Sequence, residues 1–180
     1  LEFRRVLFRS HQDHLGGLSA VTRSRPGLPV YYLDAFPAAS FASAERLGAK
    51  PVRITEARAL LPGLFTTGLV AGSTPEQALV IETTKGLIVL TGCSHPGLVG
   101  MVEAAPRVKP GAAVRLVAGG FHMLQDSQPR ITATIDRLRQ MGVQSVLPTH
   151  CTGDLATRLF REAFGERFLS GGVGTRILLD

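Results

Sequence analysis

The chain has 180 residues, of which 44% are hydrophobic, and this is enough to bury the core of one domain. No stretch is long and apolar enough to suggest a membrane span, and the net charge of +6 is spread along the chain without interleaved aromatic residues. We therefore expect neither a membrane nor a nucleic-acid partner. Two cysteines, Cys93 and Cys151, are too few for a disulfide framework.

Residues 1–10 read like a translated sequencing adapter joined to a gene fragment, so we expect them not to be native and leave them out of the fold prediction. They hold three arginines and one glutamate, and their removal leaves 17 basic and 13 acidic side chains. A genuine basic amphipathic start is the alternative. We expect a cytoplasmic protein, and export stays open because the native N-terminus is expected to be missing.

Helix-like and strand-like hydrophobic patterns alternate along the chain, which predicts a layered α/β domain. In the first third we expect a short helix over 18–22, a buried strand over 29–33 and a helix over 38–48. The middle predicts strands over 64–68, 77–83 and 87–91, the last two joined by a tight turn at Lys85–Gly86. The remainder predicts helices over 96–105, 131–141 and 155–164, and strands over 114–118, 143–147 and 174–179.

The stretch from His11 to Gly17 places two imidazoles and a carboxylate within four residues: His11, Asp13 and His14. Imidazole nitrogen and carboxylate oxygen are the ligands that Zn²⁺ and similar divalent ions take in hydrolytic sites. A polar loop that happens to contain two histidines is the alternative. The pattern favours a metal site.

The other three histidines each follow a predicted strand. His95 comes after 87–91, His122 after 114–118 and His150 after 143–147. A single histidine at the end of a strand is more often structural than a ligand. Because all five histidines of the chain lie in such loops, we predict that they gather at one edge of a sheet around a metal ion.

The stretch His11-Gln12-Asp13-His14 resembles the His-x-His-x-Asp-His motif of the metallo-β-lactamase fold superfamily, and Arg9 stands where the motif has its first histidine. Three later motifs resemble a branch of that superfamily related to dihydropterin ribofuranosyl-aminobenzene phosphate synthase: Gly92-Cys93-Ser94-His95-Pro96-Gly97, Gly119-Gly120-Phe121-His122 and Pro148-Thr149-His150-Cys151-Thr152-Gly153. The resemblance implies an αββα sandwich that is incomplete at its N-terminus, with residues 11–180 forming the C-terminal two-thirds of one domain.

The resemblance also implies a ligand set. His11 and His95 would serve a first ion with the missing histidine, and Asp13, His14 and His150 a second. The superfamily usually places a bridging aspartate where this chain has Gly119-Gly120. His122 would replace it as a ligand, contact substrate or be structural, and these alternatives stay open.

One or two Zn²⁺ ions are the expected cofactor, with Mn²⁺ or Fe²⁺ as alternatives. Neutral imidazole ligands leave such an ion acidic enough to lower the pKa of bound water to about 7, which supplies a nucleophile at neutral pH. Asp13 is the predicted catalytic residue, orienting water and taking part in proton transfer. A closed structural zinc site that includes Cys93 and Cys151 is the alternative.

We therefore predict a metal-dependent hydrolase that acts on a phosphoryl, acyl or related ester of a small molecule. Two alternatives stay open: a synthase or transferase acting on a pterin or a phosphorylated sugar, and a zinc-binding protein without turnover. The fold alone cannot decide among them. We expect the chain as written to be nearly inactive, because it lacks one histidine of the first site. The sequence does not predict the oligomeric state.

Overall fold

The computed structural model describes residues 5–10, 12–172 and 174–178 of the chain. The strands are β1 Arg5–Val6, β2 Pro29–Leu33, β3 Lys50–Ile54, β4 Arg58–Leu61, β5 Leu64–Thr66, β6 Leu79–Thr83, β7 Gly86–Thr91, β8 Val114–Gly120 and β9 Ser145–Thr149. The α-helices are α1 Gln12–Leu15, α2 Leu18–Ser24, α3 Ala38–Arg46, α4 Leu98–Glu103, α5 Gln128–Gln140 and α6 Asp154–Phe164. Two short 3₁₀ helices cover Ala105–Arg107 and Gly165–Arg167.

The larger sheet has six strands in the order β4-β5-β6-β7-β8-β9. Its first four strands run antiparallel, and the tight turn at Lys85 joins β6 to β7 as the sequence predicts. Strands β7, β8 and β9 run parallel, each connection crossing over through a helix. The carboxyl ends of these three strands therefore meet at one edge of the sheet.

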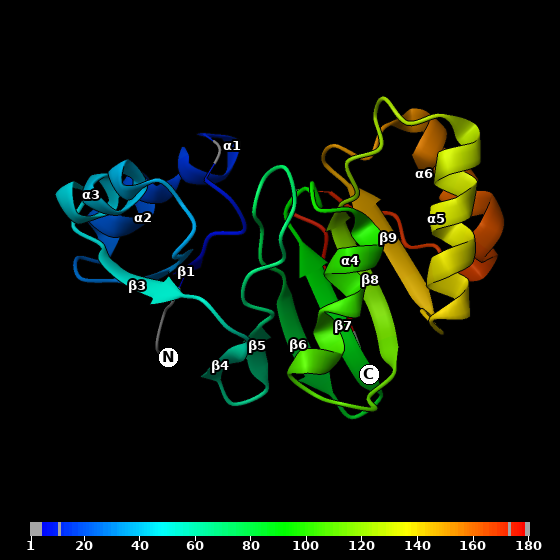
Figure 1. The fold of residues 1–180 in the computed structure, drawn as a ribbon, viewed down its shortest axis with the longest axis horizontal. Helices are drawn as coiled ribbons and strands as arrows, with labels where there is room; N and C mark the ends of the chain where they lie inside the picture. The colour runs from blue at the N-terminus through cyan, green and yellow to red at the C-terminus, as the bar shows by residue number, and fades with distance from the viewer. Residues whose placement is uncertain (1–4, 11, 173, 179–180) are drawn as a thin grey trace.

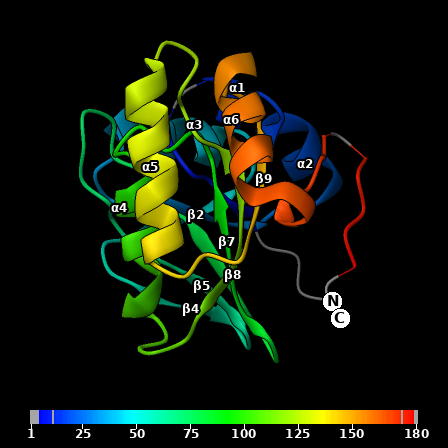
Figure 2. The ribbon, with the colours of Figure 1, turned by 90° about the vertical axis from the view of Figure 1, so that its right-hand side faces the viewer.

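Helices α4, α5 and α6 cover one face of this sheet (Figures 1 and 2). Apolar residues alternate along each parallel strand, so that Val89, Val117 and Val146 point into the core beneath these helices. Ile131 and Phe160 are fully buried there. The alternate residues of the strands, Ile88, Leu116, Ala118 and Leu147 among them, form a smaller buried cluster on the opposite face.

The smaller sheet holds three parallel strands in the order β1-β2-β3. Helices α2 and α3 lie against it on the N-terminal side of the molecule (Figure 1). Residues 6–10 are part of this body, although we left them out of the prediction: the Val6 backbone pairs with Tyr31 and the Leu7 side chain is 1% exposed. Whether they are native stays a prediction.

The predicted elements differ from the structure at several places, among them helix α1, which was expected to be an irregular loop. Strands β3 and β4 were not predicted. Each lies at the edge of its sheet, where a proline such as Pro51 and charged residues are tolerated, so neither has the pattern of a buried strand. The predicted closing strand is wrong over residues 174–178, which form no strand; Leu178 is 88% exposed.

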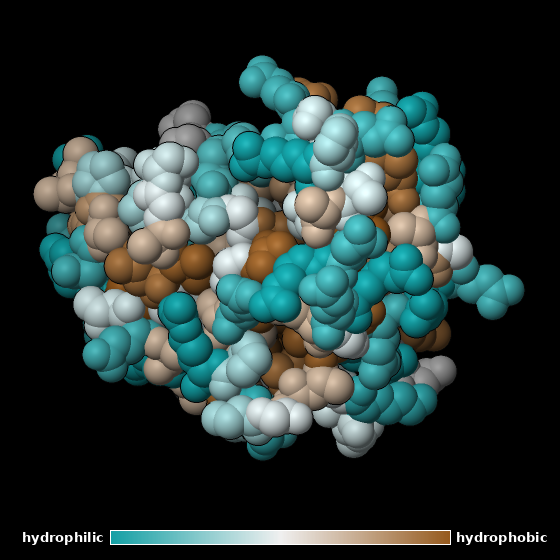
Figure 3. Space-filling model, turned by 45° about the vertical axis from the view of Figure 1, so that its right-hand side comes forward, coloured by the Kyte–Doolittle hydropathy of each residue, from teal (hydrophilic) through white to brown (hydrophobic). Residues whose placement is uncertain are grey.

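Hydrophilic side chains cover most of the molecular face drawn in Figure 3, and apolar side chains show in smaller areas between them. Within the part of the chain that the structure describes, no helix has both the length and the apolar character needed to cross a bilayer.

Candidate metal centre

The loops after β7, β8 and β9 present His95, His122 and His150 at the edge where the three parallel strands end. Among the described residues, the three non-glycine residues with positive φ all lie in these loops: Ser94 at 67°, His122 at 52° and His150 at 53°. Left-handed backbone costs about 1–3 kcal/mol at such residues and is concentrated at functional sites. The strain falls on two of the predicted site histidines themselves.

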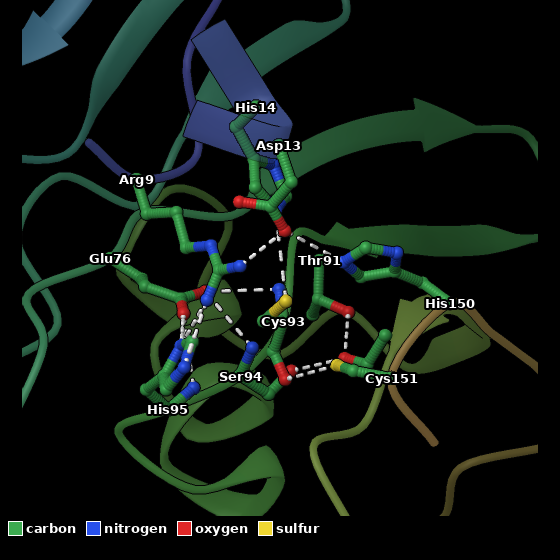
Figure 4. Close-up of polar contacts among 11 residues, drawn as sticks. Arg9, Asp13, His14, Glu76, Thr91, Cys93, Ser94, His95, His150 and Cys151 are labelled. Carbon is green, nitrogen blue, oxygen red and sulfur yellow. Dashed lines mark hydrogen bonds and ion pairs between the residues drawn. The ribbon is translucent and has the colours of Figure 1, made fainter. Parts of the chain in front are cut away.

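Four side chains form a cluster with the composition of a metal site: Asp13, His14, Cys93 and His150. One donor atom from each lies within 4.8 Å of the donors of the other three. The Asp13 carboxylate lies 3.2 Å from Nε2 of His150 and 3.4 Å from Nε2 of His14. Cys93 Sγ lies 3.6 Å from the same nitrogen of His14. Figure 4 shows these side chains converging from helix α1 and from the loops after β7 and β9.

The cluster is suited to a divalent cation by its protonation as well as its geometry. Burial lowers the pKa of His14, and the positive charge of Arg9 lowers it further, so this imidazole is neutral at neutral pH and offers a lone pair. Partial burial opposes ionisation of Asp13, but the hydrogen bond from Arg9 and the nearby positive charges outweigh it and lower its pKa. Two imidazoles, a carboxylate and a thiol that a bound metal ion would deprotonate match the tetrahedral donor sets of Zn²⁺.

The two cysteines interact across the loops that carry His95 and His150. The hydrogen bond between their thiols raises the pKa of Cys93, as does burial, and lowers the pKa of Cys151 to about 5. The Cys151 thiol also lies 3.6 Å from the backbone oxygen of Cys93. Of the two, only Cys93 belongs to the metal-ligand cluster, so a closed zinc site with both thiolates as ligands is not formed by the described residues.

Arg9 places a buried cation beside this cluster. Its side chain is 6% exposed, Nη2 donates to Asp13 Oδ2 at 2.5 Å, and Nη1 lies 2.8 Å from Nε2 of His95 (Figure 4). Its Nε has no hydrogen-bond partner among the described residues. The guanidinium therefore sits between a carboxylate and an imidazole that the resemblance assigns to two different metal ions.

His95 lies outside the metal-ligand cluster and contacts a residue that we did not predict. Its Nδ1 is 2.5 Å from Oε1 of Glu76, a carboxylate on the segment between β5 and β6 that is fully buried. On its other side the His95 ring packs against His122, with the ring centroids 3.9 Å apart and the ring planes tilted by 42°. No local pattern in the sequence singles out Glu76, because its burial arises from contacts with the segments that follow β1 and β7.

A cavity of about 420 Å³ opens beside these rings. His95, His122 and Cys151 line one side of it, and Arg130 and Asp126 at the start of α5 line another. His122 points to this cavity rather than to the metal-ligand cluster. This placement favours the reading of His122 as a substrate contact over a metal ligand.

The end of β8 has no room for the aspartate that the superfamily usually places there. A Cβ atom at Gly120 would lie 2.4 Å from the backbone oxygen of Gly92 and 2.9 Å from Sγ of Cys151. A Cβ at Gly119 would lie 2.2 Å from the backbone oxygen of Thr91. The Cys93 thiol, rather than a carboxylate on β8, supplies the fourth donor of the cluster.

The structure thus brings together three of the five predicted metal ligands, Asp13, His14 and His150. His95 lies outside this group, and the Arg9 guanidinium contacts both His95 and Asp13. His11 lies outside the described residues. Glu76 is a site residue that the sequence did not indicate; Cys93 was considered only as a ligand of the alternative closed zinc site, and Arg9 only as the residue at the position of the motif's first histidine. The metal role of each ligand stays a prediction.

Comparison with known proteins places this geometry in a family. The chain is 30% identical, over 91% of its own length and 70% of the relative's, to the 7,8-dihydropterin-6-methyl-4-(β-D-ribofuranosyl)-aminobenzene-5′-phosphate synthase of Methanocaldococcus jannaschii. No family model matches the chain.

Solved structures agree on the fold. A metal-dependent hydrolase of the β-lactamase superfamily superposes with a TM-score of 0.81 at 22% identity, covering 97% of this chain and 78% of that one. A diphosphatase from the PhnP family superposes with a TM-score of 0.61 at 12% identity, covering 97% and 70%. By its fold and by its identity to the synthase, the chain belongs to the metallo-β-lactamase fold superfamily, in the branch of the dihydropterin ribofuranosyl-aminobenzene phosphate synthase.

Proposed function

We propose that this protein is a metal-dependent hydrolase that cleaves a phosphoryl, acyl or related ester bond of a small molecule. One observation carries the proposal: the donors Asp13, His14, Cys93 and His150 converge at the edge of the sheet, where the adjoining residues His95 and Cys151 line an open cavity of about 420 Å³. A purely structural zinc site has no need of such a cavity.

Asp13, His14, Cys93 and His150 would hold a divalent ion, which would supply a Lewis acid able to lower the pKa of a bound water to about 7 and to polarise the oxygen of the scissile bond. Asp13 would orient a water molecule and take its proton: its carboxylate is 41% exposed and lies beside the imidazoles of His14 and His150. His122 and Arg130 line the cavity, where a ring N–H and a guanidinium would stabilise negative charge that develops on a phosphoryl oxygen.

The test is hydrolysis of bis(p-nitrophenyl) phosphate and p-nitrophenyl acetate by the purified chain and by an Arg9→His variant, each with Zn²⁺ or Mn²⁺. We expect the variant to hydrolyse one of these substrates and the chain as it stands to be much slower. Chelation or a second substitution, His150→Ala, should reduce the rate about 100-fold or more. Gln144→Ala, an exposed change before the same strand, is the matched control and should have no effect.

Turnover that is unchanged by His150→Ala would remove this cluster from the reaction. Tight metal binding without turnover of either substrate would favour the zinc-binding protein without activity.

A synthase or transferase that acts on a pterin is the second candidate, and the 30% identity to the M. jannaschii synthase supports it. This reading predicts release of diphosphate from a pterin diphosphate substrate in the presence of an aminobenzene acceptor, with no hydrolysis in its absence. The two assays run on the same protein and separate the two candidates.

A further inference from the structure

Glu76 is a fully buried carboxylate at the centre of the site, and the proposed reaction leaves it without a role. Its backbone is fixed by a pair of hydrogen bonds with Val70, and the next residue, Gln77, is also fully buried and hydrogen-bonded. The carboxylate therefore has little freedom to move. A buried carboxylate persists only where donors compensate for the water that it has lost.

Three successive backbone N–H groups of the loop after β7 point at this carboxylate. Ser94 N donates to Oε2 at 2.9 Å, Cys93 N donates to the same oxygen at 3.3 Å, and His95 N donates to Oε1 at 3.1 Å. Such a concave run of N–H groups is an anion nest, and it requires the left-handed backbone that Ser94 adopts at a φ of 67°. The Glu76 side chain thus stabilises a loop conformation that is strained on its own.

The carboxylate also selects the tautomer of His95. Both oxygens of Glu76 already accept backbone N–H groups, so the proton in the 2.5 Å contact between Oε1 and His95 Nδ1 belongs to the imidazole. The Nε2 atom then carries the lone pair, while Nη1 of Arg9 lies near both ring nitrogens, 2.8 Å from Nε2 and 3.0 Å from Nδ1. His95 is thereby prepared to meet a cation through Nε2.

We propose that Glu76 is the positioning residue of this site: it holds the 93–95 loop through three backbone hydrogen bonds and fixes His95 in the Nδ1–H tautomer, so that Nε2 and the Cys93 thiol are both presented to cations. The tautomer assignment stands without any metal. The consequence for metal affinity rests on the proposed function, because Cys93 belongs to the metal-ligand cluster and lies on the same loop.

Long-range ¹H–¹⁵N correlation spectra of the metal-free protein, labelled with ¹⁵N-histidine, test the tautomer directly. The His95 signals are assigned by their loss in His95→Gln. We expect Nδ1–H in the chain as it stands. In Glu76→Gln the amide NH₂ replaces one acceptor oxygen and donates to Nδ1, which moves the proton to Nε2. An Nε2–H tautomer in the unaltered chain, or an unchanged Nδ1–H tautomer in Glu76→Gln, would overturn the proposal.

Zn²⁺ binding is the second readout. We expect Glu76→Gln to weaken the affinity about 10- to 100-fold, the range seen when a residue that orients a ligand is replaced. Glu82→Gln makes the same chemical change at a partly exposed site paired with Lys109, and should alter neither the tautomer nor the affinity. Loss of affinity with no change of tautomer would leave only a general structural role and refute the proposal.

Discussion

The positively charged guanidinium of Arg9 lies between Asp13 and His95, two residues that the resemblance assigns as metal ligands. Its guanidinium bonds to Asp13 and His95 together, and it is almost completely buried. A guanidinium cannot lose its proton and offers no lone pair, so it competes with a metal ion and cannot help to bind one. In this chain we therefore expect one metal ion, at the cluster formed by Asp13, His14, Cys93 and His150.

Replacing this arginine tests that expectation. In Arg9→His we predict that the number of Zn²⁺ ions bound per chain rises from one to two, because the change removes a fixed cation and adds an imidazole near His95. Elemental analysis of the protein after dialysis against buffered Zn²⁺ measures the ratio. Arg23→His, on the exposed side of α2, is the control and should bind one ion. A ratio of one in Arg9→His would show that the guanidinium does not occupy a metal position.

Much of the site could be predicted from residue types alone, because imidazoles and carboxylates are few and their chemistry is distinctive. Asp13, His14 and His150 meet as the strand-end pattern predicts. Glu76 could not be found in this way, because a glutamate beside a proline and a glutamine is typical of an exposed loop. Its importance depends on three N–H groups some 18 residues further along the chain, and no local pattern contains that contact.

At the scale of elements, the parallel strands β7 and β8 approach each other so closely that glycine is needed at the end of β8, where the following loop begins. We predict that Gly120→Ala destabilises the protein by about 1–3 kcal/mol, because the new methyl group would lie 2.4 Å from the Gly92 oxygen. Chemical denaturation followed by circular dichroism measures the change in the free energy of unfolding.

Gly100→Ala is the matched control for this prediction. Gly100 lies in helix α4 with open space around its missing Cβ, so alanine there should stabilise the protein by about 0.5–1 kcal/mol. If Gly120→Ala and Gly100→Ala changed the free energy of unfolding equally, movement of β7 would be relieving the crowding at Gly120.

The elements themselves were predictable where burial gives a strand or helix its full pattern. Strand β2 has the predicted bounds, 29–33, because four of its five residues are buried and apolar. Edge strands β3 and β4 were missed, since they need only part of that pattern. The apolar run near the C-terminus was mistaken for a strand because residues that pack over a sheet face, such as Ile177, look the same in sequence as residues within a sheet.

At the scale of the whole molecule, one buried side chain connects the two sheets. Gln77 donates from Nε2 to the backbone oxygen of Leu7 at 2.8 Å, and its Oε1 accepts from the Thr66 hydroxyl at 2.6 Å. Its backbone N–H donates to the oxygen of Phe8. The segment before helix α1 is thereby fixed to the strands that lead to the metal-ligand cluster.

We predict that Gln77→Leu destabilises the protein by about 2–4 kcal/mol, because it leaves the Thr66 hydroxyl and the Leu7 carbonyl buried without their partner. Hydrogen exchange should increase first in β1 and β2. Gln144→Leu, an exposed change, should leave both the stability and the exchange pattern as they were. Uniform acceleration of exchange across both sheets would contradict the role of Gln77 as a local connection.

The four donors of the cluster are separated by as many as 137 positions along the chain, and they meet only when helix α1, β7 and β9 are all in place. An unfolded chain cannot reproduce such an arrangement, so free Zn²⁺ binds almost exclusively to the native form and shifts the folding equilibrium by mass action. The supply of zinc in the surrounding medium would then govern how long each molecule survives proteolysis, quite apart from any reaction that it catalyses.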